Sequence, residues 1–355
     1  MLVTKLLRNW GYRVFTPSRL VRHKYRSFKE LLQFDQRSLE YIARLEDIYY
    51  QDKPVDFACI LRLCRELSLE VYALARALTE MQPRRYKDVL AYEQKIDFYI
   101  QMALMLDEVR SSPPYVQTLQ GDEARIGGKA CNLARIKNEL GLQIPRGFVL
   151  NSSAFNYFLE HNNLRNQLDE LLAETCFAQA RELKELCAKM QNLILDSEVP
   201  GAICREVESF LQEFELQESK LALRSSAVAE DSAASFAGQY ESILRVEPQR
   251  WSEAYKKVLA SKYSPQAVSY RIEQGLADCM APMAVLLLEM VEPQFSGIMY
   301  TQGIRDNSEL EIYLRQGSGE ALAAGQELAE EIFLSREQDY REGENSFSSL
   351  WGKEL

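Results

Sequence analysis

The first third of the chain has the apolar spacing of α-helices. Between residues 28 and 109, leucine and isoleucine recur at steps of three and four, as at Leu39, Ile42 and Leu45. Pro54 and Pro83 interrupt this pattern, because proline cannot continue the interior of a helix. The sequence therefore predicts roughly three helices in an α-helical N-terminal module over residues 1–112, in which no motif indicates a chemistry.

The pattern changes after Ser111-Ser112-Pro113-Pro114, the clearest linker in the chain. Short apolar runs now alternate with helical stretches, and Ser152-Ser153 is a candidate helix cap. We expect strands at 147–150, 221–224, 242–246, 283–291, 297–301 and 310–314, and helices at 152–160, 178–195, 201–214, 250–260 and 264–274. The predicted fold class is α+β, with a mixed domain over residues 113–355.

Composition limits the classes of protein to which the chain can belong. Its 355 residues suggest two or three domains, and 46% hydrophobic with 26% charged residues is typical of a soluble globular protein. No apolar run approaches the roughly 18 to 20 residues that cross a bilayer. The seven cysteines form no CxxC pair, and His23 and His161 are the only histidines. The sequence thus argues against a disulfide framework, a structural zinc site and a histidine-rich metal site, and favours a reducing, cytoplasmic environment.

The charge of the chain is divided unevenly. Residues 1–29 carry eight lysines or arginines and no acid, whereas the remainder has 34 basic against 52 acidic residues. An acidic body repels phosphates, so we expect no nucleic-acid partner. The basic start favours a structural or interaction segment, with an organelle targeting peptide or an arm that docks on acidic lipid as the alternatives.

The first candidate site is IGGKACNLARI at 126–136. Gly127 and Gly128 would let the backbone approach a ligand, and a helix beginning there would direct its free N–H groups and its dipole at an anion. Lys129 adds a positive charge, supported by the turn and strand of the downstream GLQIPRGFVL. The segment lacks GxxxxGK[ST] and is not a Walker P-loop, and a plain turn with a solvated lysine is the alternative.

The second candidate site is the stretch LALRSSAVAEDSAASFAGQY. We expect Arg224 at the end of an apolar strand, where its planar guanidinium could bind a phosphate through two hydrogen bonds. Serines such as Ser225 and Ser235 could donate to phosphate oxygens, and the small residues up to Gly238 would let backbone N–H groups come close. The alternative is an ordinary loop in which Arg224 pairs with the acidic residues at 230–231.

Two further stretches have weaker signals. AVLLLEMVEPQFSGIMYT is predicted to form a hairpin, in which the backbone of Glu289, Met290 and Val291 could read an adenine edge with the Met290 side chain against the ring. RQGSGEALAAG is a glycine-spaced loop entering a short helix, with Glu320 placed to meet a metal or a ribose. A plain core hairpin and a common loop are the alternatives.

Together, these segments resemble a known family. They are, in chain order, GGKACNLARI with GLQIPRGFVL, LALRSSAVAEDSAASFAGQYESIL, SKYSPQAVSYRIEQG, AVLLLEMVEPQFSGIMYT and GSGEALAAG. The series is similar to the nucleotide-binding domain of phosphoenolpyruvate synthase (pyruvate, water dikinase), and also to pyruvate, phosphate dikinase and rifampicin phosphotransferase. The resemblance covers about residues 119–335, and RSSAVAEDSAASFAGQ is its most specific part. The helical module lies outside the general family pattern.

The resemblance implies an ATP-grasp fold, in which two α/β subdomains close over ATP with Mg²⁺ between the phosphates. Lys129 and Arg224 match the family's phosphate-contacting lysine and arginine, and are therefore the candidate catalytic residues. The segment 235–238 would cover the triphosphate, and the segment 289–291 would border the adenine. The physical interpretation agrees, since phosphoryl transfer needs positioning and charge neutralisation more than covalent chemistry.

The chain also departs from the family pattern. We find no acidic metal-binding strand and no glutamine–arginine–proline segment before Leu355, and neither histidine lies in a glycine-rich carrier loop. Gln302 stands where the family has an arginine, and the Asp-Pro that follows it there is missing, which puts one phosphate or metal contact in doubt. We therefore expect either the front part of a longer enzyme or a truncated, degenerate relative.

The sequence thus predicts the ATP-binding part of a phosphoenolpyruvate-synthase-like dikinase. It would bind Mg·ATP and phosphorylate a histidine on a downstream swivelling domain, with a pyruvate-binding domain beyond, and the 355 residues alone should not convert pyruvate. The alternatives are an antibiotic phosphotransferase of the rifampicin type and a nucleotide-sensing or scaffold protein that works through its helical module. Formation of a homo-oligomer is left open.

Overall fold

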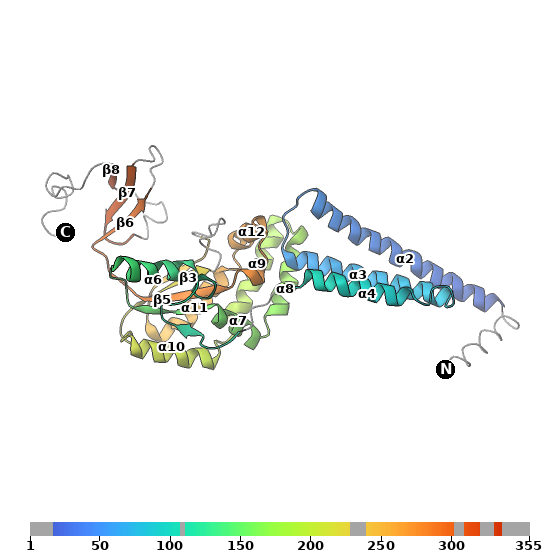
Figure 1. Ribbon diagram of the computed structural model, residues 1–355, viewed down its shortest axis with the longest axis horizontal. Helices are drawn as coiled ribbons and strands as arrows, with labels where there is room; N and C mark the ends of the chain where they lie inside the picture. The colour runs from blue at the N-terminus through green and yellow to red at the C-terminus, as the bar shows by residue number, and fades with distance from the viewer. Residues whose placement is uncertain (1–16, 107–110, 228–238, 302–308, 320–329, 336–355) are drawn as a thin grey trace. The chain divides into compact units, whose positions relative to one another are not determined.

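The computed structural model describes residues 17–106, 111–227, 239–301, 309–319 and 330–335 (Figure 1). The chain forms two compact units, Met1–Met290 and Val291–Leu355. The first contains the helical module together with a mixed helix-and-sheet body, and the second contains a small sheet. The boundary that the sequence suggests at residues 112–113 stays a prediction.

The helical module consists of α2 (Pro17–Tyr50), α3 (Phe57–Met81) and α4 (Val89–Leu104), which confirms the three predicted helices. Helix α3 contacts both α2 and α4. Asp56 caps α3, because its Oδ1 accepts a hydrogen bond of 2.9 Å from the Ala58 amide. Tyr41, Leu45 and Ile48 of α2 pack around the buried Leu63 of α3, so one apolar stripe of α2 is used inside the module.

The body of the first unit is built on an antiparallel five-stranded sheet of order β1-β2-β5-β3-β4. Its strands are β1 (Val116–Gln117), β2 (Gly147–Leu150), β3 (Leu221–Ala227), β4 (Ser242–Val246) and β5 (Met283–Glu289). Strands β2 and β4 have the predicted bounds. Strand β3 is longer than predicted and β5 is shorter, so Arg224 lies within β3 and not at its end.

Each face of this sheet packs against its own apolar core. Leu223, Val285 and Leu287 join the larger core, and Leu286 and Leu288 join a smaller one with residues of α6. Alternation along the strands directs neighbouring side chains to opposite faces. The helices of the larger core are α7 (Ser152–His161), α8 (Arg165–Glu174), α9 (Ala180–Asp196), α10 (Gly201–Glu213), α11 (Trp251–Ser261) and α12 (Pro265–Glu273), and those of the smaller core are α5 (Glu123–Ile126) and α6 (Gly128–Leu140).

Two local expectations were wrong. Asn151, not Ser152-Ser153, caps α7, since its Oδ1 accepts a hydrogen bond of 3.2 Å from the Ala154 amide. The segment 284–301 is not a hairpin. Strand β5 pairs with β2 and β3 on its two edges, and β6 (Phe295–Tyr300) belongs to the second unit, where it pairs with β7 (Glu309–Gln316). With both edges of β5 occupied, no edge is left for a returning strand.

The second unit contains an antiparallel sheet of order β6-β7-β8. Strands β6 and β7 match two predicted strands, and β8 (Glu330–Ser335) was not predicted. Gly297 lies beside β7, and a Cβ there would come within 2.8 Å of the Tyr313 carbonyl oxygen. A glycine at this position therefore permits the close pairing of β6 with β7.

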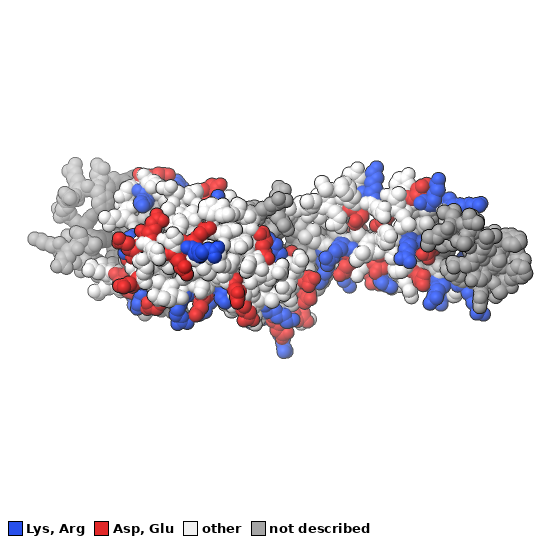
Figure 2. Space-filling model, turned by 90° about the horizontal axis from the view of Figure 1, so that it is seen from below, with Lys and Arg blue, Asp and Glu red and all other residues white. Residues whose placement is uncertain are grey.

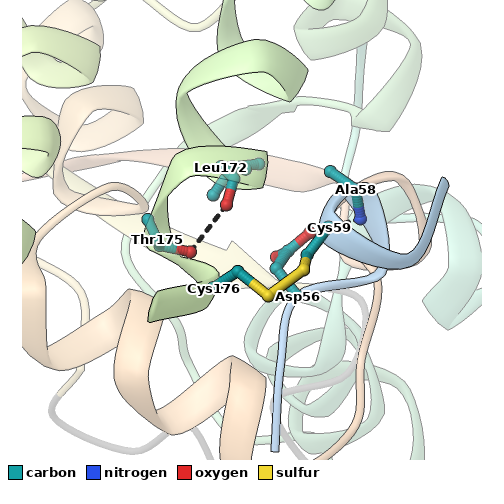
Figure 3. The surroundings of a disulfide bond; sticks show 6 residues. All are labelled: Asp56, Ala58, Cys59, Leu172, Thr175 and Cys176. Carbon is teal, nitrogen blue, oxygen red and sulfur yellow. Dashed lines mark hydrogen bonds between the residues drawn. A yellow bond between two sulfur atoms is a disulfide. The ribbon is translucent and has the colours of Figure 1, made fainter. Parts of the chain in front are cut away.

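A disulfide joins the helical module to the body (Figure 3). Cys59 in α3 is bonded to Cys176 in the short 3₁₀ helix Thr175–Phe177, although 117 residues separate them in the sequence. The cysteine pattern did not predict this pair, because an odd number of cysteines without a CxxC motif does not prevent one bond between cysteines that folding brings together. The cytoplasmic location stays a prediction. The disulfide does not support it, because disulfides are rare in reducing compartments.

The surface carries both signs of charge, and Figure 2 shows acidic and basic side chains interspersed on one face. Within the described ranges, no helix combines the length and the apolar character that spanning a membrane would require. The charged residues are distributed over the helical module and the body alike, with broad uncharged areas between them (Figure 2).

Candidate functional site

The Gly-Gly-Lys segment lies at the joint between α5 and α6, directly against β3. Gly127 has φ +76°, which belongs to the left-handed region that favours glycine. A Cβ at this residue would come within 1.9 Å of the Ser226 carbonyl oxygen. Gly127 is therefore required for α6 to approach the sheet, a contact within the protein that the sequence alone did not predict.

Two serines of β3 hold the start of α6 in place. The Ser226 hydroxyl accepts a hydrogen bond of 3.1 Å from the Ala130 amide. The Lys129 ammonium donates to the Ser225 carbonyl oxygen at 3.2 Å and lies 3.4 Å from the Ser225 hydroxyl. Both serines are fully buried, whereas Lys129 is half-buried. The structure thus brings together Gly127, Gly128, Lys129 and Ser225, as expected for one site. Contact of Ser225 with a phosphate stays a prediction.

Arg224 is the one exposed residue in β3, which is otherwise buried from Leu221 to Ala227. It lies opposite Leu286 of β5, and Leu286 packs in the smaller core beside α6. Residues that face each other on neighbouring antiparallel strands share one side of the sheet. Arg224 therefore projects on the side of the sheet that carries α6 and Lys129, with its guanidinium in contact with solvent.

The segment 289–291 lies at the end of β5, and its contact with an adenine stays a prediction. Glu289 forms a two-fold hydrogen-bonded ion pair with Arg146, at 2.9 Å from Nε and 2.8 Å from Nη2, and accepts a further hydrogen bond from Ser219. Hydrogen bonding from Arg146 lowers the pKa of Glu289. The Met290 amide donates to the Lys220 carbonyl oxygen at 2.8 Å, and the second unit begins at the exposed Val291.

Other predicted residues lie outside the described part of the chain. These are Ser235, Gly238 and Glu320, together with Gln302. Among the described residues, no group of three or more histidine, cysteine, aspartate or glutamate side chains could hold a metal ion. The described part of the site is therefore the Lys129–Ser225 joint with Arg224 beside it.

The same region is matched by a family of nucleotide-binding domains. The family described as pyruvate phosphate dikinase, AMP/ATP-binding domain, matches residues 123–345, which include Lys129, Ser225 and Arg224. The chain belongs to this family. The match begins at α5 and therefore leaves out the three helices of the N-terminal module.

Individual members of the family show the same similarity. The chain is 29% identical over 231 residues to the probable phosphoenolpyruvate synthase of Staphylothermus marinus, covering 62% of this chain and 28% of the relative. It is 30% identical over 235 residues to the phosphoenolpyruvate synthase of Escherichia coli, covering 62% and 29%. It is 32% identical over 204 residues to the rifampicin phosphotransferase of Bacillus cereus, covering 56% and 23%. The chain spans less than a third of the length of these relatives.

The family region also contains a buried charge cluster that sequence reasoning missed. Lys262 and Arg271, from SKYSPQAVSYRIEQG, are fully buried. Asp278 lies 2.9 Å from the Lys262 ammonium and 3.3 Å from Arg271, and Arg271 also lies 3.3 Å from Asp56 of the helical module. Burial raises the pKa of Asp278, but the two cations together lower it below its ordinary value. Polar and apolar residues are mixed in this segment, so its sequence does not mark the two basic residues as buried.

A cavity of about 220 Å³ lies away from Lys129 and Arg224. It runs beside the second half of α6, where its walls include Lys137, Ile144, Arg146 and Phe214. Lys129 and Arg224 are not among its lining residues. The cavity therefore gives no support for placing the triphosphate there.

Proposed function

We propose that the chain binds ATP in a nucleotide-binding domain of the ATP-grasp type, with Lys129 and Arg224 contacting the phosphates. The observation that carries the proposal is the hydrogen bonding between Lys129 and Ser225, which joins the Gly-Gly-Lys helix start to the Arg-Ser-Ser strand. These two segments lie 96 residues apart in the sequence, and both fall within the matched nucleotide-binding family region.

The physical role of the two cations follows from how each is held. Lys129 is tethered at its ammonium to β3, so the orientation of its flexible stem is restricted before ligand arrives. Arg224 is on a strand whose neighbours are buried, which fixes its backbone while its guanidinium stays accessible for two parallel hydrogen bonds to phosphate. Cations positioned in advance stabilise the charge that develops on a phosphoryl group during transfer.

In this proposal, magnesium arrives with the nucleotide. The described residues offer no cluster of ligands that would hold a metal by themselves. Protein-bound Mg²⁺ often takes only one or two carboxylates, with the remaining positions filled by phosphate oxygens and water. When bound, it would neutralise phosphate charge, and the roles of Lys129 and Arg224 do not depend on its position.

For the whole protein, we propose phosphoryl transfer from ATP to a histidine on a downstream swivelling domain, followed by transfer to pyruvate. The support is the family and the phosphoenolpyruvate synthases among the relatives, which are more than three times longer than the region matched here. In the proposal the final acceptor depends on the swivelling and pyruvate-binding domains, whereas the ATP-binding step can be tested on the residues described here.

Rifampicin is the second candidate acceptor. The similarity to the rifampicin phosphotransferase of Bacillus cereus, at 32% identity, is as high as that to the synthases. The ATP-binding region is common to both groups, so it does not separate them. An assay of the full-length protein with ATP and either pyruvate or rifampicin, following phosphorylated product by mass spectrometry, decides between the two acceptors.

Thermal unfolding with and without about 1 mM Mg·ATP tests the binding step. At a ligand concentration a hundred times the dissociation constant, binding stabilises the folded state by about 2.7 kcal/mol, which raises the midpoint by several degrees. We expect Lys129→Ala and Arg224→Ala to abolish most of this increase. The midpoint of each variant without nucleotide should stay close to that of the natural chain, because neither side chain is fully buried.

Lys137→Ala is the matched control. Lys137 is an exposed lysine in the same helix, eight residues further on and about 12 Å away along the helix axis. Its loss should leave the ATP-dependent increase intact. An equal loss of the ATP-dependent increase in Lys137→Ala and Lys129→Ala would indicate general electrostatic attraction. If ATP does not raise the midpoint of the natural chain, a scaffold role of the helical module becomes the better proposal.

A further inference from the structure

Helix α2 carries a second apolar stripe on the side that it does not use inside the helical module. Positions 21, 25, 28, 32, 35, 39, 42, 46 and 49 follow one another at alternating steps of four and three. We call these nine positions the outer seam. Seven of them are apolar or aromatic and exposed, with exposed fractions between 38% and 79%: Val21, Tyr25, Phe28, Leu32, Leu39, Ile42 and Tyr49.

A strict seven-residue repeat of this kind is typical of one helix packed along another. The repeat keeps a straight seam facing a partner helix in a left-handed coiled coil. The inner stripe of α2, which includes Tyr41, Leu45 and Ile48, already packs against α3. The outer seam continues over about four heptads, or roughly 42 Å, which is enough for a stable helix pair.

The charges on α2 indicate which partner fits. In the first half, five basic residues outnumber one acid, Glu30; the basic residues are Arg19, Arg22, Lys24, Arg26 and Lys29. In the second half the four acids outnumber two arginines; the acids are Asp35, Glu40, Glu46 and Asp47. A helix that is basic at one end and acidic at the other complements a copy of itself when the two run in opposite directions.

We propose that the outer seam pairs with the outer seam of a second copy of this chain, in antiparallel orientation. When the pair is centred on the helix, Phe28 faces Leu39 of the second copy and Tyr25 faces its Ile42. The two acidic interruptions then fall beside basic residues. Glu46 meets the end that carries Arg22 and Lys24 of the second copy, and Asp35 lies within a helical turn of its Lys29.

Other occupants of the seam fit less well. A parallel pair would place the two basic halves against each other and the two acidic halves against each other, which is unfavourable at close range. An anionic membrane surface would attract the first half of α2 but repel the second half, although the exposed apolar residues continue into it up to Tyr49. Only the antiparallel copy uses the whole length of the seam.

Sedimentation of the 355-residue chain over about 1 to 100 μM tests this interface. We expect a monomer–dimer equilibrium, weakened at least ten-fold by Leu39→Glu. The matched control is Leu69→Glu, because Leu69 is equally exposed, at 63% against 57% for Leu39, but lies on α3. Leu69→Glu should leave the dimer unchanged, and circular dichroism should give both variants the helix content of the natural chain.

Charge reversal tests the orientation. One double variant, Asp35→Lys with Glu46→Lys, and another, Arg22→Glu with Lys29→Glu, should each dimerise poorly, whereas an equal mixture of the two should form a heterodimer with at least the natural affinity. In a parallel pair each half of the helix faces the same half of its copy, so neither double variant alone should dimerise worse than the natural chain, and this result would overturn the proposal. A natural chain that stays monomeric at 100 μM, or that binds anionic vesicles as a monomer through the same residues, would also overturn it.

Discussion

At two places in the first unit, a cation connects segments that are far apart in the sequence. The cations at these two places differ in burial and in the kind of partner. At the Lys129–Ser225 joint, a half-buried lysine is held by a backbone carbonyl oxygen and lies close to a hydroxyl, and Arg224 beside it is exposed. In the buried charge cluster, where the helical module meets the body, Lys262 and Arg271 are fully buried and lie against two carboxylates. Accessible cations can attract an anionic ligand, whereas buried cations with carboxylate partners bind parts of the protein to one another.

This difference distinguishes a candidate ligand site from a buried contact that only stabilises the fold. Burying a charge costs several kcal/mol unless a partner of opposite sign compensates for it. Asp56 and Asp278 supply that compensation for Arg271, and Asp56 comes from the helical module, outside the matched family region. The module is therefore integrated into the body of this chain by a buried ion pair and a disulfide.

The largest expected effect comes from replacing the buried arginine. Arg271→Met leaves the buried Asp56 without its ion-pair partner and Asp278 with Lys262 alone, and should lower the free energy of unfolding by about 3–5 kcal/mol. The matched variant Arg224→Met changes an exposed residue of β3 and should alter this free energy by less than about 0.5 kcal/mol. Urea unfolding measures both. Similar losses of stability in the two variants would mean that Arg224 supports the fold as much as Arg271 does, which would contradict this distinction.

The disulfide should contribute the next largest effect. Cys59→Ser removes a cross-link that spans 117 residues, and we expect a loss of about 2–4 kcal/mol. Cys64→Ser, in the same helix, removes a free thiol and serves as the control. A reducing agent should lower the unfolding midpoint of the natural chain to that of Cys59→Ser and leave Cys59→Ser itself unaffected. A natural chain that is insensitive to reduction would argue against a bond between these cysteines in solution.

The hydrogen bond that anchors α6 should have a smaller effect. Ser226→Ala leaves the buried Ala130 amide without its acceptor, which costs about 1–3 kcal/mol in unfolding experiments. Ser242→Ala, on the exposed side of β4, should be close to neutral. Because Ser226 fixes the helix that carries Lys129, we also expect Ser226→Ala to weaken ATP binding. Full ATP affinity in this variant would mean that the hydrogen bond between Ser226 and Ala130 does not position Lys129.

The smallest effect concerns the pH dependence of the Arg146–Glu289 pair. Arg146 lowers the pKa of Glu289 in the folded state, so the pair stabilises the fold above the ordinary glutamate pKa of about 4.3 and loses this contribution as pH falls through the lowered value. Glu289→Gln should therefore be less stable than the natural chain at neutral pH, and the difference should disappear near pH 3. A constant difference across this range would show that titration of Glu289 does not contribute.

Local pattern was sufficient to predict much of the secondary structure but not the contacts between its elements. Strands β2 and β4 and the three module helices follow from apolar spacing and proline positions, which act over a few residues. Strand β8 and the short β1 were missed, because pairing with distant strands stabilises them more than their own sequence does.

The candidate site was predicted in part, for a related reason. The Gly-Gly-Lys and Arg-Ser-Ser segments were identified from residue type, and folding does bring them together. The burial of Ser225 and the position of Arg224 within β3 could not be read locally, since both depend on which strand and helix lie alongside. The pairing of Asp56 with Arg271, 215 residues away, left no local signal at all.

Calorimetric titration of ATP and of adenosine into the natural chain, Lys129→Ala and Arg224→Ala tests the central claim most directly. If the two cations contact the phosphates and not the base, each substitution should weaken ATP binding at least ten-fold, about 1.4 kcal/mol, and leave adenosine binding unchanged. Equal weakening of ATP and adenosine, or unchanged ATP binding in both variants, would contradict the assignment of Lys129 and Arg224 to the triphosphate.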